Sequence, residues 1–204
     1  NSNKIVTVGP SESMSKSKRN TIDPEKIIND FGADAVRLFI LSDSPPEKDV
    51  QWSEQGMIAS YKFIQKLWTL HEKIKQIINK NIKGDKEEIS KYTNQLINKV
   101  NSNLDRFNYN VIIANMYEAY NYLFKKIDNK IDNENLKENY RKILTVMSPI
   151  IPHFTSECLS ELNFETKQEW PIINKKLLEE EQINYVIQIN GKKKRILNTY
   201  KDMS

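Results

Sequence analysis

The chain has 204 residues, 38% of them hydrophobic and 28% charged, and a formal net charge of +4 at pH 7. This composition is typical of globular proteins, and its modest basic excess permits RNA binding without demanding it. No apolar run approaches about 18 residues, so we predict no membrane span. The single cysteine, Cys158, excludes an internal disulfide and a multi-cysteine zinc site, and it fits a reducing, cytoplasmic location.

The first residues contain neither a start methionine nor a signal-peptide pattern, so we expect the chain to begin inside a longer protein. Residues 5–10 predict a short buried strand that ends in a turn. Asp23, Pro24 and Glu25 predict the start of a helix, because they suit its cap, its first position and its positive end. Between the strand and the helix lies a basic run, Ser13-Met14-Ser15-Lys16-Ser17-Lys18-Arg19-Asn20. We expect a mobile loop whose hydroxyls, N–H groups and lysines suit a phosphate-rich ligand.

Two short amphipathic helices are expected next, around residues 27–31 and 36–39. Gly32 would take a left-handed cap between them, and Asp34 would cap the second helix. Residues 42–52 contain Pro45-Pro46 and predict a linker, because neither a helix nor a central strand tolerates this pair.

Four longer amphipathic helices are expected between Ser53 and Met147, because apolar residues recur there every three or four positions. Burying each large side chain contributes roughly 1.5–3 kcal/mol, so four such stripes can sustain a bundle. Aromatic residues at this spacing are core residues by default rather than platforms for base stacking. The expected core residues are Met57, Tyr61, Ile64, Trp68, His71, Ile74, Ile78, Ile89, Tyr92, Leu96, Val100, Leu104, Phe107, Ile113, Met116, Tyr117, Tyr120, Leu123, Phe124, Ile127, Leu136, Tyr140, Ile143, Leu144 and Met147.

A shorter helix follows Pro152, with Phe154, Cys158, Leu159 and Leu162 on its apolar side. From residue 184 onward the period becomes two, and Asn190-Gly191 predicts a tight hairpin turn. A lone hairpin is marginally stable in water, so we expect residues 184–204 to be loosely held unless they dock on the bundle.

The loop resembles the Lys-Met-Ser-Lys-Ser signature of class I aminoacyl-tRNA synthetases. The resemblance continues, nearly without gaps, through residues 31–41 and 44–53, and there the chain is similar to bacterial leucyl-tRNA synthetases. Residues 17–20 and 44–49 fit the leucine enzymes better than those for isoleucine, valine or methionine. Residues 187–192 are similar to the start of the family's C-terminal domain.

The resemblance implies a mainly α fold with three parts. Residues 1–52 would hold the signature loop and a small strand–loop–helix stem-contact region. Residues 53–171 would form a helical bundle of the anticodon-binding-domain type, and residues 172–204 would begin the C-terminal domain with a β-hairpin.

The implied function is that of a leucine–tRNA ligase, which adenylates leucine with ATP and transfers it to tRNA(Leu). The nucleotide fold, the leucine pocket and any editing domain are absent from these residues, so the chain alone is expected to be inactive. The expected partner is tRNA(Leu). The parent enzyme is expected to use ATP, leucine and Mg²⁺ and to be a monomer.

Lys16 matches the second lysine of the signature, which in the family stabilises charge on the leaving pyrophosphate. It is therefore the expected catalytic residue, and a flexible ammonium group suits charge that develops in a transition state. Met14, Ser15, Lys16 and Ser17 are the expected ATP-binding residues. Met14 would anchor the loop by packing, and the two serines would either hold the loop or donate to phosphate.

Ser13 departs from the family pattern, which usually has lysine at this position. Either Lys18 or Arg19 compensates for the missing charge, or ATP binds more weakly.

Exposed basic residues are the expected tRNA contacts, because they can bind phosphates. Arg37 has a structural alternative, which is to pair with a nearby carboxylate. Both histidines, His71 and His153, are expected to pack or cap rather than to bind a ligand. We find no metal-ligand spacing and predict no metal site. The candidate tRNA contacts are Lys18, Arg19, Arg37, Lys125, Lys126, Lys192, Lys193, Lys194 and Arg195.

Two other interpretations stay open. The first keeps the enzyme class but changes the amino acid to isoleucine, valine or methionine. The second is a helical module that binds RNA or protein without any role for ATP, in which residues 13–20 are only a basic loop.

Overall fold

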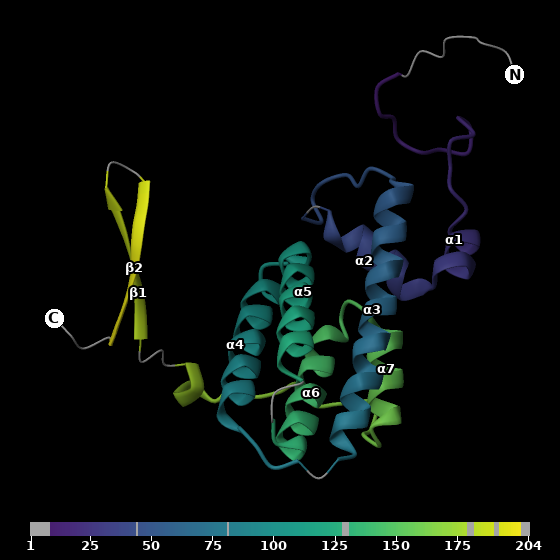
Figure 1. Cartoon of the computed structure of the whole chain (residues 1–204). Coiled ribbons are helices and arrows are strands. Elements are labelled where there is room, and N and C mark those ends of the chain that lie inside the picture. The colour runs from purple at the N-terminus through teal and green to yellow at the C-terminus, as the bar shows by residue number, and fades with distance from the viewer. Residues whose placement is uncertain are drawn as a thin grey trace, which may run out of the picture.

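The computed structural model describes residues 9–43, 45–80, 82–127, 131–178, 182–189 and 192–200, and for the last two ranges only the backbone, apart from Lys194 and Arg195. The described chain is mainly helical, which confirms that part of the predicted fold (Figure 1). No helix in these ranges is both long enough and apolar enough to cross a membrane. The elements are α1 (Pro24–Phe31), α2 (Ala33–Ser42), α3 (Glu54–Ile78), α4 (Glu87–Leu104), α5 (Tyr109–Lys126), α6 (Asn133–Met147), α7 (Pro152–Glu161), the 3₁₀ turn η1 (Lys175–Leu178), β1 (Gln182–Ile189) and β2 (Lys192–Tyr200).

Side-chain caps begin two helices where the sequence predicts them. The Asp23 carboxylate accepts the N–H of Glu25 at 3.0 Å, and Pro24 occupies the first position of α1. Ser53 Oγ accepts the N–H of Gly56 at 3.1 Å at the start of α3. Each cap supplies an acceptor to an N–H group that the first turn leaves without a helical partner.

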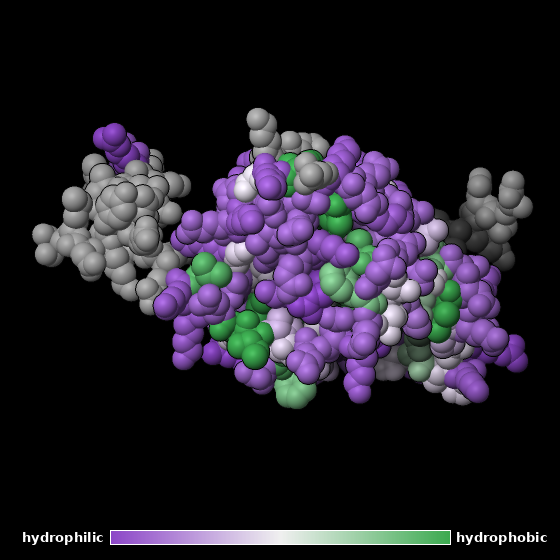
Figure 2. Space-filling model, turned by 90° about the horizontal axis from the view of Figure 1, so that it is seen from below, coloured by the Kyte–Doolittle hydropathy of each residue, from purple (hydrophilic) through white to green (hydrophobic). Residues whose placement is uncertain are grey.

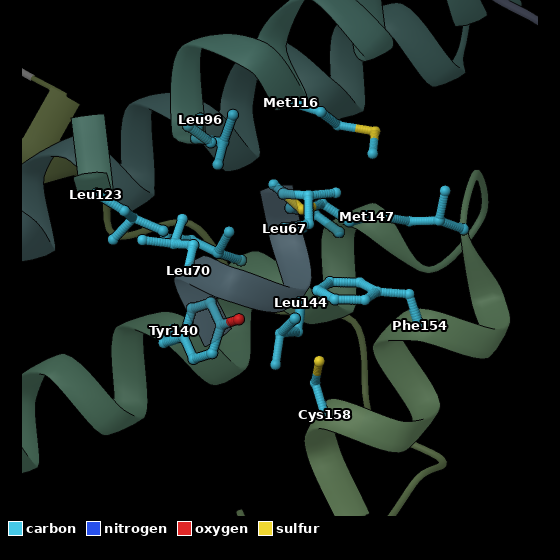
Figure 3. Packing of buried hydrophobic residues seen from close by; sticks show 14 of the residues in the cluster. Leu67, Leu70, Leu96, Met116, Leu123, Tyr140, Leu144, Met147, Phe154 and Cys158 are labelled. Atoms are coloured by element: carbon cyan, nitrogen blue, oxygen red, sulfur yellow. The ribbon is translucent and has the colours of Figure 1, made fainter. Parts of the chain in front are cut away.

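The main hydrophobic core lies between α3, α4, α5, α6 and α7. Figure 3 shows side chains from all five helices converging there, including Leu67 of α3, Leu96 of α4, Met116 of α5 and Leu144 of α6. The predicted stripes of α6 and α7 are fully confirmed. Their buried members are Leu136, Tyr140, Ile143, Leu144, Met147, Phe154, Cys158, Leu159 and Leu162.

Helix α3 buries more of its surface than a single stripe. Phe63, Leu67 and Leu70 are buried, although the predicted stripe omitted them, while Tyr61 and Trp68 of that stripe are only half-buried. The reason is that α3 packs against five other helices, α1, α2, α5, α6 and α7. A helix with several neighbours buries a face wider than the stripe expected for one.

Three aromatic residues predicted to lie in the core are exposed instead. Phe107 is 59% exposed, and its backbone takes a positive φ of 56° in the turn between α4 and α5. Tyr117 and Phe124 of α5 are 40% and 48% exposed. The core prediction is wrong for these three residues. Phe107 lies in a turn, and Tyr117 and Phe124 lie at the edge of the buried face of α5.

An acidic residue of α2 caps α7. The buried Asp34 carboxylate accepts the N–H of Phe154 at 2.6 Å and that of His153 at 3.3 Å. The expectation that Asp34 caps its own helix is wrong, since the N-cap residue of α2 is Gly32 and this helix has no side-chain cap. Gly32 does have a positive φ of 82°, but its ψ of 151° lies outside the left-handed helical region.

A basic residue of α2 binds the end of the turn that precedes α7. Arg37 donates from Nε to the carbonyl oxygen of Ile150 at 2.9 Å and from Nη2 to that of Pro149 at 2.7 Å. Its partners are therefore main-chain carbonyls and not the carboxylate that the sequence suggested. Together with Asp34, it fixes α2 to the junction between α6 and α7.

A smaller apolar cluster joins α2 to the start of α3. It consists of Ala35, Phe39 and Met57, and the ring of Trp52 meets the Phe39 ring edge to face at 5.3 Å. Gly56 permits this approach, because a Cβ atom there would lie 2.8 Å from Phe39 Cε2.

The C-terminal strands pair antiparallel, with Tyr185 opposite Leu197 and an irregularity between Ile187 and Gln188. Figure 1 shows them apart from the helical body. The expected turn at 190–191 lies outside the described residues. The surface seen from below is mostly hydrophilic, with apolar residues in small separate patches (Figure 2).

We predict that Asp34→Ala lowers the free energy of unfolding by about 1–3 kcal/mol, because two N–H groups of α7 lose a buried charged acceptor. Urea denaturation of the chain measures this. The control is Asp23→Ala at the exposed cap of α1, for which we expect a loss below about 1 kcal/mol. Equal losses in the two variants would contradict the role assigned to Asp34.

Candidate functional site

The basic loop is closed by the side chain of Asn20. Its Oδ1 accepts the N–H of Ser15 at 2.9 Å, and its Nδ2 donates to the carbonyl oxygen of Ser13 at 3.3 Å. Asn20 was not among the predicted functional residues. The available signal was the tendency of asparagine side chains to bond nearby backbone groups in turns.

The two serines of the loop bond to the loop itself. Their hydroxyl oxygens, Ser15 Oγ and Ser17 Oγ, lie 3.1 Å apart. The N–H of Lys18 donates to Ser15 Oγ at 3.3 Å and to the Ser15 carbonyl oxygen at 3.2 Å. These contacts support one of the two roles expected of the serines, which is to hold the loop.

The loop cations differ in their partners. Lys18 Nζ lies 2.9 Å from Glu12 Oε2, with both side chains about half exposed. Such surface pairs contribute about 0–1 kcal/mol, but this one offsets the charge of Lys18. Within the described ranges, no carboxylate lies at ion-pair distance from Lys16 or Arg19. These two exposed cations are thus the ones best placed to meet an anionic ligand.

Met14 does not anchor the loop by packing. Its side chain is 48% exposed and lines an open cleft of about 690 Å³ together with Asn20, Val50 and Trp52. The expected packing is wrong, because the cleft is open and leaves about half of this side chain exposed. The cleft leaves space beside the loop for a ligand.

The remaining candidate tRNA contacts are dispersed over the molecule. Lys125 is exposed near the end of α5, while Lys126 Nζ pairs with Glu88 Oε1 at 2.6 Å. Lys194 and Arg195 are exposed on β2, and for Lys192 and Lys193 only the backbone is described. The guanidinium group of Arg37 is already bonded to two carbonyl oxygens. Among the candidates whose side chains the structure describes, only Lys18 and Arg19 are close in sequence to the expected ATP residues.

His71 is fully buried, as the sequence predicts. Its Nδ1 lies 3.2 Å from Tyr140 Oη and its Nε2 lies 3.0 Å from Glu161 Oε2. Burial lowers the pKa of His71, and the hydrogen bond to Glu161 only partly opposes this shift. Ligand atoms of His71, Glu72 and Glu161 lie within 4.8 Å of one another. We assign no metal there, because Lys75 Nζ already lies 2.6 Å from Glu161 and 3.0 Å from Glu72.

His153 lies at the start of α7, where its backbone N–H bonds to Asp34. Its side chain is exposed, so the helix-start position is as expected but the packed ring is not.

A family model described as the anticodon-binding domain of tRNA ligase matches residues 86–204, which is more than half of the chain. The chain belongs to this family. A second family model, described as tRNA synthetases class I for I, L, M and V, matches residues 2–53 and therefore covers the loop.

Curated relatives confirm the resemblance to leucyl-tRNA synthetases. The leucine–tRNA ligase of Bartonella tribocorum is 36% identical over 203 residues, which cover 93% of this chain and 23% of that enzyme. The leucine–tRNA ligase of Orientia tsutsugamushi is 39% identical over 198 residues, which cover 95% of this chain and 23% of that enzyme. The chain thus spans about a quarter of the length of the relatives it matches.

A solved structure shares the fold. It is a ternary complex of the agnB2 LeuRS of Agrobacterium radiobacter K84 with tRNA and LeuAMS. The TM-score is 0.79 at 24% sequence identity, and the match covers 94% of this chain and 26% of that one.

The lowered pKa of His71 predicts that the protein becomes less stable as the pH is lowered. In the unfolded chain a histidine binds a proton below about pH 6.5. The buried His71 of the folded chain binds its proton only at a lower pH, because its pKa is lowered. As the pH falls, protonation therefore favours the unfolded state. The stabilising effect is complete above pH 6.5 and is lost as the pH falls from there toward the lowered pKa. One proton changes stability by at most about 1.4 kcal/mol per pH unit.

Urea denaturation between pH 7.5 and pH 5 measures this slope. We expect His71→Gln to reduce it, because the variant removes the titrating imidazole. A slope that His71→Gln does not alter would contradict the assignment.

Proposed function

We propose that this chain forms part of a leucine–tRNA ligase, in which it supplies the loop that binds the phosphates of ATP and a helical bundle that binds tRNA(Leu). The observation that carries the proposal is the match to leucine–tRNA ligases over more than nine-tenths of the chain, together with the class I family model that covers the loop. Among the four amino acids of the class I family model, these relatives favour leucine.

Lys16 is the proposed catalytic residue of the loop. When leucine attacks the α-phosphate of ATP, negative charge grows on the leaving pyrophosphate. An exposed ammonium group without a carboxylate partner among the described residues can move toward that charge and stabilise it. Met14, Ser15 and Ser17 complete the proposed ATP site, with Ser15 and Ser17 shaping the loop and offering hydroxyls to phosphate.

Arg19 is the proposed substitute for the lysine that the family usually has at position 13. Lys18 is less suited, because Glu12 already offsets its charge. The cations of residues 13–20 attract phosphate and repel metal ions, and this run contains no carboxylate, so Mg²⁺ would arrive with ATP and not be held by the loop itself.

The proposed division of labour follows the sequence. Residues 1–52 carry the signature loop and the stem-contact region, residues 53–171 form the tRNA-binding bundle, and residues 172–204 begin a C-terminal domain. The class I family model ends at residue 53, and the anticodon-binding family model begins at residue 86. This separation supports a change of role between the loop region and the bundle. The leucine pocket and the rest of the ATP site would come from other parts of the enzyme.

The alternative without a role for ATP has less support. It treats residues 13–20 as a basic surface loop, yet the class I family model includes them. It predicts that deleting the loop abolishes RNA binding, whereas the ligase proposal predicts that most RNA binding survives.

Lys16→Ala in the full-length enzyme should reduce leucine-dependent exchange between ATP and pyrophosphate by about tenfold or more. This corresponds to the loss of a charged hydrogen bond of roughly 1.5–3 kcal/mol. The effect should appear mainly in kcat, because the charge develops in the transition state.

Lys26→Ala, which removes a surface lysine of α1 outside the loop, is the matched control and should be nearly neutral. Absence of any leucine-dependent exchange by the unaltered enzyme would reject the ligase proposal. Exchange that Lys16→Ala leaves intact would reject only the role of Lys16.

A further inference from the structure

One face of the helical body combines cations with exposed aromatic rings. Lys62, Lys66 and Lys73 are exposed on α3 at spacings of four and seven residues, which place them on one side of the helix. Beside them on α5 lie Tyr117 and Phe124, seven residues apart and 40% and 48% exposed. We call these five residues the α3–α5 strip. None of them was among the candidate tRNA contacts.

Contacts between α3 and α5 connect the row of lysines to the row of aromatic rings. Lys73 Nζ lies 4.8 Å from the centre of the Phe124 ring, over its face. The Tyr117 ring stacks on buried Phe63 of α3, with centroids 3.7 Å apart and an interplanar angle of 24°. Packing therefore holds the aromatic rings in place, and they are not loose surface side chains.

The acidic residues of α3 and α5 do not pair with the lysines of the α3–α5 strip. Glu72 accepts from Lys75, which also bonds to Glu161 of α7, and Glu118 pairs with Lys99 of α4 at 3.0 Å. Glu54, the other acidic residue of α3, lines a cleft beside α1. In the part of the chain that the structure describes, no carboxylate lies within ion-pair distance of the three lysines of the strip.

We propose that the α3–α5 strip is an RNA-binding surface, where the three lysines contact phosphates and Tyr117 and Phe124 stack on unpaired bases or ribose faces. An uncompensated row of cations suits a polyanion, and exposed aromatic rings suit bases that have left a helix. A protein partner would bury the rings equally well, but it would not require three unpaired lysines. The inference rests on the proposed tRNA-binding function and gives it a location.

The test is the affinity of the chain for a tRNA(Leu) transcript across a series of KCl concentrations. Replacing Lys62, Lys66 and Lys73 together by alanine should weaken binding about tenfold or more and reduce the slope of log K against log[KCl] by about 2–3. The matched control replaces three exposed lysines outside the strip, Lys86, Lys99 and Lys167, and should change the affinity less than about threefold.

Stacking is tested by a second pair of variants at one position. Phe124→Leu keeps an apolar side chain but removes the ring, and it should weaken binding about fivefold or more, whereas Phe124→Trp should retain affinity. Equal effects of the two lysine triples would overturn the strip while leaving tRNA binding intact. Absence of tRNA binding by the unaltered chain would reject that part of the proposed function and the strip with it.

A protein-binding strip gives a different result. In that case Phe124→Leu would abolish the concentration-dependent association of the chain with itself in sedimentation experiments. It would leave the affinity for RNA unchanged, and this result would also overturn the proposal.

Discussion

Two side chains of α2, Asp34 and Arg37, bond to the junction between α6 and α7 and determine how the loop end of the molecule is held. Asp34 caps α7 with a buried carboxylate, and one helical turn later Arg37 binds the two carbonyl oxygens just before it. Opposite charges on one helix thus bind opposite backbone groups about 115 residues away, which orients α2 as well as anchoring it. Leu38, the residue after Arg37, enters the main core.

This attachment links the loop to the bundle through a short path. The loop leads into α1, Gly32 turns the chain into α2, and α2 is fixed to α7 by Asp34. The cluster of Ala35, Phe39 and Met57 adds a second attachment to α3. A rigid path of this kind would let a tRNA-binding bundle and a phosphate-binding loop keep a defined orientation toward each other. It also means that the proposed boundary at 52/53 crosses packed structure.

The sequence predicted the parts of the fold that depend on local patterns. The cap at Asp23, the helix start at Ser53 and the predicted apolar stripes of α6 and α7 follow from periodicity and side-chain chemistry. The failures on the helices share one cause, which is that a pattern along a helix does not reveal which other helix it meets. Asp34 has the right chemistry for a cap but serves α7, and Tyr117 has helical spacing but lies at the edge of the core. In the loop, Lys16 was identifiable from the signature, whereas the closing role of Asn20 required coordinates.

Native-state hydrogen exchange of the chain is the most direct test of whether α2 belongs to the bundle. If the attachment acts as described, the amides of α2 should open with the same free energy as those of α6 and α7, as one cooperative unit. The loop amides of residues 13–20, outside this unit, should exchange much faster. Exchange of α2 at a clearly lower free energy, with α6 and α7 still protected, would contradict the account.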